Sequence, residues 1–235
     1  MKVLALDTTT PACSVALAYG DQTLFRFQLA SREHTQLILP MIDDILAEAD
    51  LPLTELDALA FTHGPGSFTG IRIGFGVVQG LAFGADLPVV PVSSLETLAT
   101  TAVRHLELGN ACQVMPMFDA RMDEIYWASF CWRDNELQRV VADSLDAPEQ
   151  INTPCSDLPI VGIGDGWHLR ERIALSPQLV EPSLMPDARD VLQIALPMVA
   201  NGAGKAVDEV QPLYLRDKVS WKKRQRLRDQ QGSHQ

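Results

Sequence analysis

The order of the elements that the sequence predicts constrains its fold more than any other feature. Short apolar runs bounded by turn residues predict strands, and apolar residues spaced three or four apart predict helices. The first part of the chain predicts strands at 3–6, 13–19, 24–29, 56–61 and 88–91, and helices at 34–50, 68–83 and 93–106. The second part predicts strands at 114–119, 125–132, 137–145 and 159–163, and a helix at about 188–200.

Strands followed by helices, twice over, predict an α/β protein with two subdomains of related topology. We expect the first subdomain at residues 1–108 and the second at residues 109–235, with the helix at 188–200 free to pack back on the first. A chain of 235 residues with 46% hydrophobic residues can bury a core of this size.

Cysteine spacing and hydropathy indicate where the protein resides. Cys13, Cys112, Cys131 and Cys155 lie far apart without a C-x-x-C pair, which argues against structural zinc or a disulfide scaffold. No uninterrupted apolar run approaches the roughly 18 residues of a membrane span, and Asp7 interrupts the first apolar run. We therefore expect a cytoplasmic protein with no membrane partner.

Charge is spread unevenly along the chain. The net charge is −11, yet residues 216–235 contain seven Lys or Arg and two Asp or Glu, so that tail carries +5 and the remainder −16. A negative surface disfavours direct binding to a nucleic-acid backbone. The basic tail is read first as a solvated terminus, and second as a tether for RNA or an acidic partner.

Two loops offer candidate nucleotide chemistry. Asp7, Thr8 and Thr9 come directly after the first strand, where they fit either a site for hydrated magnesium and phosphate or a turn that bonds to local backbone. Gly64, Gly66 and Ser67 precede a helix, whose N-terminus favours an anion. This loop lacks the Walker lysine and the G-x-G-x-x-G spacing, so alone it is a weak signal.

The two helices predicted at 34–50 and 68–83 suggest a surface for a partner. One face of the first helix is apolar, and each glycine inside the second costs about 1 kcal/mol against alanine. Gly76, Gly80 and Gly84 form a smooth ridge, on which either the chain's own sheet or a partner helix could pack. The predicted interface comprises Ile38, Met41, Ile42, Ile45, Gly70, Gly74 and Gly80.

Residues that could act as an independent active site are few. The five histidines never occur at H-x-x-x-H or H-E-x-x-H spacing, and Ser67 lacks the G-x-S-x-G elbow. We therefore assign no catalytic and no metal-binding residue. The alternative is a nucleotide hydrolase or metal-dependent peptidase that acts through Asp7 and the loop at 64–70.

Several motifs taken together resemble the bacterial TsaB (YeaZ) family. They are Leu4-Ala5-Leu6-Asp7-Thr8-Thr9, Glu33-His34-Thr35-Gln36, and Gly64-Pro65-Gly66-Ser67-Phe68-Thr69-Gly70, with Pro212-Leu213-Tyr214-Leu215-Arg216 near the end. That family takes part in making threonylcarbamoyladenosine on tRNA, at the adenosine beside the anticodon. The resemblance implies an actin/Hsp70-kinase-like fold and dimerisation through the N-terminal helices.

The resemblance also implies partners. These are the catalytic paralogue TsaD, the ATPase TsaE and a second copy of the chain, with tRNA bound only through the complex. TsaD carries V-N-H-L-E-G-H, whose two histidines bind metal, whereas Ser94 and Leu98 stand at those positions here, and of the motif's polar residues only Glu96 is retained. We therefore expect a non-catalytic subunit that activates TsaD. It needs no cofactor of its own, although weak or interface-shared ATP or ADP with Mg²⁺ stays open.

Overall fold

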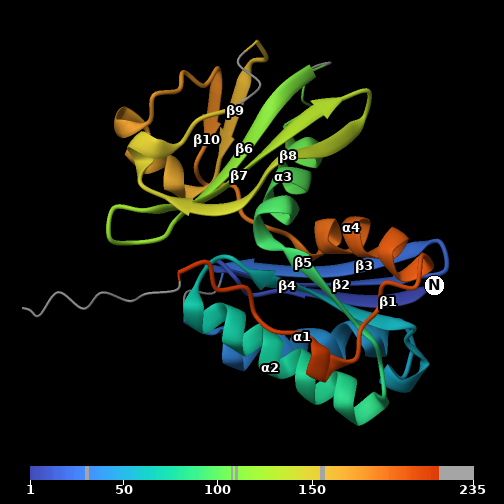
Figure 1. Ribbon diagram of the computed structural model, residues 1–235. Coiled ribbons are helices and arrows are strands. Elements are labelled where there is room, and N and C mark those ends of the chain that lie inside the picture. The colour runs from blue at the N-terminus through green and yellow to red at the C-terminus, as the bar shows by residue number, and fades with distance from the viewer. Residues whose placement is uncertain (30–31, 107, 109–110, 154–156, 217–235) are drawn as a thin grey trace, which may run out of the picture.

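The computed structural model describes residues 1–29, 32–106, 108, 111–153 and 157–216. Of the basic tail at 216–235, all but Arg216 lies outside these residues. The described chain forms two five-stranded sheets, one in each subdomain, and Figure 1 shows the two stacked one above the other.

The first sheet has the order β3-β2-β1-β4-β5. Its strands are β1 (Lys2–Asp7), β2 (Ala12–Tyr19), β3 (Gln22–Leu29), β4 (Ala58–Gly64) and β5 (Val89–Ser93). β1, β2 and β3 form an antiparallel meander in which Leu4 pairs with Leu17, and β4 and β5 lie parallel to β1. The central strands are buried on both faces, which is why they read as continuous apolar runs.

The second sheet has the order β10-β9-β6-β7-β8. Its strands are β6 (Ala111–Asp119), β7 (Ile125–Arg133), β8 (Glu136–Asp146), β9 (Ile160–Ile163) and β10 (Leu179–Glu181). β6, β7 and β8 form an antiparallel meander, and β9 and β10 are parallel to β6 and to each other. The two sheets therefore share one topology, as the sequence predicted. β10 was not predicted, because three residues are too few for a strand pattern.

Helices cover the two sheets unequally. The long helices are α1 (His34–Glu48), α2 (Phe68–Ala85), α3 (Ser94–His105) and α4 (Ala188–Ala200), and the short 3-10 turns are η1 (Leu53–Glu55), η2 (Pro148–Gln150), η3 (Asp165–Arg172) and η4 (Val207–Glu209). Side chains cap three helix starts: Ser67 accepts from the Gly70 amide, Ser93 from the Glu96 amide and Asp187 from the Arg189 amide. Such caps satisfy amide groups that have no partner within the helix.

Two helices exchange places between the subdomains. α4 packs on the face of the first sheet opposite α1 and α2, over small residues such as Ala5 and Ala60. α3 packs on the second sheet instead, where Leu95 and Leu98 contact Val114 and Phe130 in one core. The sequence placed α3 within the first subdomain, and this is corrected: the chain crosses over at Ser93–Ser94, because the apolar face of α3 is buried by β6, β7 and β9. From here, the first subdomain means the first sheet with α1, α2 and α4.

α2 has the length and composition of a membrane-spanning helix, with a mean hydropathy of 1.2 over 18 residues. Within the fold it contacts α1 and β4, and its residues Val78 and Ala82 are buried in the core of the first subdomain. Arg72 and Gln79 interrupt its apolar sequence. Its hydropathy is that of a helix which packs on a sheet along one side.

Candidate functional site

Asp7 lies at the carboxyl end of β1, inside a closed turn. Its Oδ1 accepts hydrogen bonds from the Thr9 amide (3.3 Å), the Thr9 hydroxyl (2.6 Å) and the Thr62 hydroxyl (2.5 Å). Its Oδ2 is buried and has no hydrogen-bond partner among the described residues. Because burial disfavours the charged carboxylate, the pKa of Asp7 is raised to about 6. This is the geometry of a turn that bonds to local backbone, which was one of the two interpretations of Asp7, Thr8 and Thr9 from the sequence.

The two candidate nucleotide loops pack directly on each other. The Thr8 hydroxyl donates to the Gly70 carbonyl (2.8 Å), and the Ser67 amide donates to the Thr9 carbonyl (2.8 Å). A Cβ atom at Gly66 would lie 2.7 Å from the Thr9 carbonyl oxygen. The glycines of this loop therefore allow the chain's own backbone to approach, which is a second use of the missing side chain besides ligand binding.

The same packing tests whether nucleotide and magnesium fit this loop. Asp7 is 0% exposed and Thr8 and Thr9 are each 1% exposed, so their oxygen atoms face the protein interior. Among the described residues, no group of three or more His, Cys, Asp or Glu is placed to hold a metal ion. The loop in this arrangement does not fit a phosphate or Mg²⁺, which would reach Asp7 only if the two loops separated.

The positions that correspond to the paralogue's metal ligands lie at the start of α3. Ser94 and Leu98 are both fully buried, and Leu98 is part of the core of the second subdomain. Glu96 forms an ion pair with Arg139 of β8 at 2.6 Å. Glu96, the one polar residue of the motif that is retained, thus connects α3 to the second sheet.

Six of the seven residues predicted for the partner interface are buried within the chain. Ile38, Met41, Ile42 and Ile45 are at most 8% exposed and form the core between α1 and the first sheet. Gly70 and Gly74 face the chain's own Thr8, with a Cβ at Gly74 2.5 Å from the Thr8 hydroxyl oxygen. These six residues offer little accessible surface, because they lie on the sides of α1 and α2 that pack against the chain's own sheet and Thr8.

The glycine ridge of α2, by contrast, points away from the protein. A Cβ at Gly76, Gly80 or Gly84 would meet no atom within 4 Å, so the chain's own sheet does not pack on it. With 100° per residue, Phe83 lies on the same side of the helix and is 87% exposed. We name the surface of Leu39, Gly76, Gly80, Phe83 and Gly84 the α1–α2 face.

A groove of about 420 Å³ runs between α1 and α2 beside this ridge. Its lining includes the apolar side chains of Ile38, Leu39, Ile73, Val77 and Leu81, together with Gly76 and Gly80. Leu39 is 47% exposed. The sequence analysis missed Leu39 and Phe83 because neither belongs to the strongest apolar stripe of its helix.

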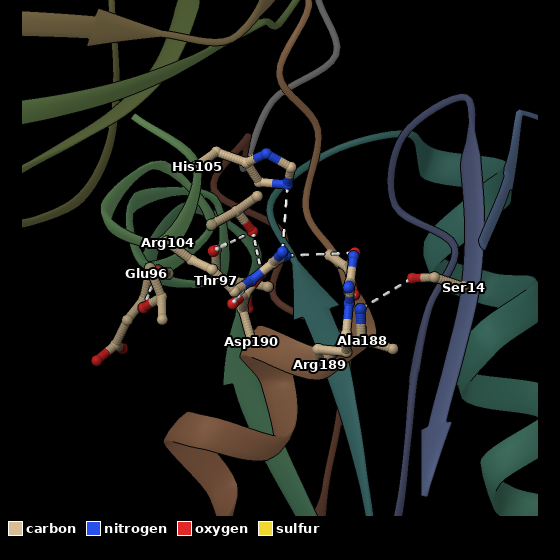
Figure 2. Close-up of polar contacts among 11 residues, drawn as sticks. Ser14, Glu96, Thr97, Arg104, His105, Ala188, Arg189 and Asp190 are labelled. Atoms are coloured by element: carbon tan, nitrogen blue, oxygen red, sulfur yellow. Dashed lines mark hydrogen bonds and ion pairs between the residues drawn. The ribbon is translucent and has the colours of Figure 1, made fainter. Parts of the chain in front are cut away.

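A network of ion pairs connects α3 to α4 where the two subdomains meet, as Figure 2 shows. Arg104 donates to both oxygens of Asp190 (2.8 and 2.7 Å), and the Thr101 hydroxyl donates to the same carboxylate (2.7 Å). Arg189 pairs with Asp187, whose pKa is lowered by these hydrogen bonds despite its burial. No sequence pattern pointed to this network, because Arg104 and Asp190 are 86 residues apart.

Comparison with known proteins adds to this geometry. A family model described as "TsaD: tRNA N6-adenosine threonylcarbamoyltransferase" matches residues 28–161. The chain is 42% identical to the tRNA threonylcarbamoyladenosine biosynthesis protein TsaB of Escherichia coli, covering 95% of this chain and 98% of the relative. It is 39% identical to the protein of the same name from Haemophilus influenzae, covering 95% and 97%.

A solved structure of YeaZ from Pseudomonas aeruginosa is similar to this fold. The two align with a TM-score of 0.86 at 41% identity, over 91% of this chain and 99% of that one. A second Pseudomonas aeruginosa structure, described as an uncharacterized protein with similarity to peptidase YEAZ, aligns with a TM-score of 0.86 at 40% identity, over 92% and 99%.

Two α/β subdomains of one topology, between which the chain crosses over at α3 and α4, define a protein of the actin/Hsp70-kinase-like class. Within that class, the chain belongs to the TsaB (YeaZ) family of tRNA threonylcarbamoyladenosine biosynthesis proteins.

Proposed function

We propose that this chain is a non-catalytic partner that scaffolds and activates the catalytic paralogue TsaD in forming threonylcarbamoyladenosine on tRNA. The observation that carries the proposal is the open α1–α2 face: three glycines in one row of α2 point into empty space beside an apolar groove. Each of these glycines costs about 1 kcal/mol of helix stability against alanine. Three such glycines on one side of α2 leave a surface on which another helix backbone can pack closely.

The exposed side chains of the face supply apolar area for such a partner. Phe83 is 87% exposed and Leu39, which lines the groove, is 47% exposed, and a single Phe can bury roughly 150–250 Å² of surface on binding. Smooth ridges and flanking large residues are the complementary shapes that helix packing needs. A second copy of the chain presents the same face, so we propose that homodimer and TsaD heterodimer compete for it.

Two features support a role without catalysis of its own. The Asp7 loop and the Gly64–Gly70 loop bury each other's polar atoms, and Leu98 stands where the paralogue has a metal ligand. On this proposal tRNA and the ATPase TsaE act through the complex in the cytoplasm, and any ATP or ADP with Mg²⁺ binds at the shared interface.

Gly80→Leu tests the proposal. A Cβ atom at this position meets no atom within 4 Å, so the protein should fold, but the added side chain blocks close approach of a partner helix. We expect the affinity for TsaD to fall about tenfold or more, together with tRNA modification by the reconstituted complex. The matched control is Gln193→Leu, which adds the same side chain at an exposed position of α4 on the other face of the sheet. Equal loss in both variants, or none in Gly80→Leu, contradicts the proposal.

The alternative, a nucleotide hydrolase or peptidase acting through Asp7, has its own test. Titration of the isolated protein with ATP and magnesium in a calorimeter, and then a turnover assay, are compared between the natural chain and Asp7→Ala. We expect neither tight binding nor turnover. Strong binding with turnover that Asp7→Ala abolishes overturns the non-catalytic assignment.

A further inference from the structure

The segment from Pro212 to Arg216 contacts both subdomains. In the first subdomain, the Leu213 amide donates to the His63 carbonyl at 2.8 Å, at the end of β4. The Leu213 carbonyl lies over Gly64, where a Cβ atom would approach within 2.7 Å of its oxygen. The hydroxyl of Tyr214 accepts from Nε of Arg72 at 3.2 Å. The segment is therefore attached to both ends of the glycine loop that leads into α2.

Two residues later the segment enters the second subdomain through Arg216. Nη2 of this guanidinium donates to the carbonyls of Ala120 (3.1 Å) and Arg121 (3.3 Å) and pairs with the carboxylate of Glu124. Nη1 lies 3.1 Å from the sulfur of Met122. The side chain of Arg216 is only 18% exposed. All three oxygen acceptors lie around Nη2 and share its two N–H groups, and the charge of the guanidinium strengthens the bond to the Glu124 carboxylate.

The hairpin that Arg216 holds connects β6 to β7. Three consecutive residues other than glycine, Arg121, Met122 and Asp123, have left-handed backbone (φ 64°, 58° and 61°). Such conformations are costly and persist where surrounding contacts enforce them. In the second sheet this hairpin occupies the place that the Asp7–Thr9 loop occupies in the first, because each connects the first two strands of its meander. Arg216 supplies part of the contacts that hold it.

Besides the hydrogen bond from the Ser93 hydroxyl to Asp143 at the start of α3, two further groups of contacts connect the subdomains. One is the pair of crossing helices with the Arg104–Asp190 network (Figure 2). The other is the segment at 212–216, which Figure 1 shows in red to the left of α3 and α4, between the two sheets. Two bodies joined only at a hinge keep a rotational freedom, and a second attachment away from the hinge removes it.

We infer that residues 212–216 form a strap that fixes the two subdomains at one relative angle, with Arg216 as its anchor in the second subdomain. The strap also ties the glycine loop of the first subdomain to the hairpin of the second. This inference rests on contacts within the chain and does not depend on which partner binds the α1–α2 face.

Hydrogen exchange of the full chain measures the strap directly. In Arg216→Ala we expect the amides of 213–215 and of the hairpin at 120–124 to exchange about tenfold faster or more, since both lose the contact that closes them. The matched control is Arg172→Ala, because Arg172 contacts Asp123 of the same hairpin (3.2 Å) from within the second subdomain. That variant should leave the amides of 213–215 unchanged.

The angle between subdomains needs a second measurement. One spin label is placed on an unnatural amino acid at each of two exposed positions, Asp50 in the first subdomain and Asp134 in the second. The pair of labels reports the distance between the two subdomains. We expect a broader distance distribution in Arg216→Ala and an unchanged one in Arg172→Ala. If Arg216→Ala does not fold by circular dichroism, Arg216→Lys, which keeps the charge beside Glu124, gives the same comparison. Unchanged exchange and distance in the Arg216 variant, or equal changes in both variants, overturn the strap.

Discussion

The two subdomains have the same strand order but differ in the element that succeeds the fourth strand. In the first, β4 leads into the 18-residue helix α2, and in the second, β9 leads into the eight-residue turn η3. The first sheet has long helices on both faces, whereas the second has α3 on one face and η3 on the other. The extra helical surface of the first subdomain is where the α1–α2 face lies. The two subdomains thus share one topology and differ in the length of two connections, because α1 also stands where the second subdomain has only η2 between β8 and β9.

The glycine loops, in contrast, are alike in the two subdomains. Gly66 packs on the Thr9 carbonyl, and Gly166 packs on Met117 and Phe118 at the end of β6. In both, the loop after the fourth strand lies against the end of the first strand of the meander. Closure of the loop is thus common to both subdomains, and it does not distinguish the subdomain that carries the α1–α2 face.

The largest expected effect tests whether this closure is structural. A Cβ at Gly70 would overlap the Thr8 carbonyl, so Gly70→Ala should lower the free energy of unfolding by more than about 3 kcal/mol. Gly76→Ala, six residues along the same helix and facing open space, should raise it by up to about 1 kcal/mol. Urea unfolding of both variants measures the difference. A tolerated Gly70→Ala would mean that the two loops are not held together as described.

The second-largest expected effect is the change of stability with pH that the protonation of Asp7 causes. It distinguishes Asp7 from Asp119, the residue at the corresponding end of β6. The pKa of Asp7 is raised from 3.8 to about 6, so the folded state favours the protonated form. This stabilises the fold fully below pH 3.8 and is lost as the pH rises through 6, a loss of about 3 kcal/mol. Asp7→Asn lacks this titration, so its stability relative to the natural chain should rise between pH 4 and pH 7.

Urea unfolding at several pH values measures that change, and Asp119→Asn is the matched control at the corresponding strand end. The Asp119 side chain is 18% exposed and pairs with Arg121, in contrast to the fully buried Asp7. Parallel stability curves for Asp7→Asn and the natural chain would contradict the raised pKa.

The smallest effect concerns the junction between the subdomains. Arg104→Ala leaves the Asp190 carboxylate, which is 1% exposed, with the Thr101 hydroxyl as its remaining side-chain donor among the described residues. We expect a loss of about 2 kcal/mol, less than for a fully buried pair because the Arg104 side chain is 31% exposed. Arg26→Ala, which breaks an exposed pair with Glu48, should cost less than about 1 kcal/mol. Equal losses would place the Arg104 pair among ordinary surface ion pairs.

Local patterns were enough to predict the strands and helices, because hydrophobic periodicity and caps such as Ser93 act within a few residues. The surface against which each apolar face is buried was harder to predict. An apolar stripe such as Ile38 and Ile42 shows that a face is buried, but the same stripe suits the chain's own sheet and a partner. The exchange of α3 and α4 was only half foreseen for that reason.

One signal for the glycine ridge was present in the sequence. The row Gly70, Gly74, Val78 and Ala82 is uniformly small or apolar and faces the core, whereas Gly76, Gly80 and Gly84 extend a row that begins with Arg72. A charged residue in a row marks the outer side of a helix. The networks of Arg104 and Arg216 left no such signal, since each depends on contacts between residues far apart in sequence.

The position of α4 has a consequence for how the protein is made. Synthesis proceeds from the N-terminus, and the five strands of the first sheet are complete by Ser93, yet one face of that sheet is covered only by Ala188–Ala200. The nascent first subdomain therefore exposes an apolar sheet face until nearly the whole chain has left the ribosome. Its folding is in effect post-translational, although its strands are the first to emerge.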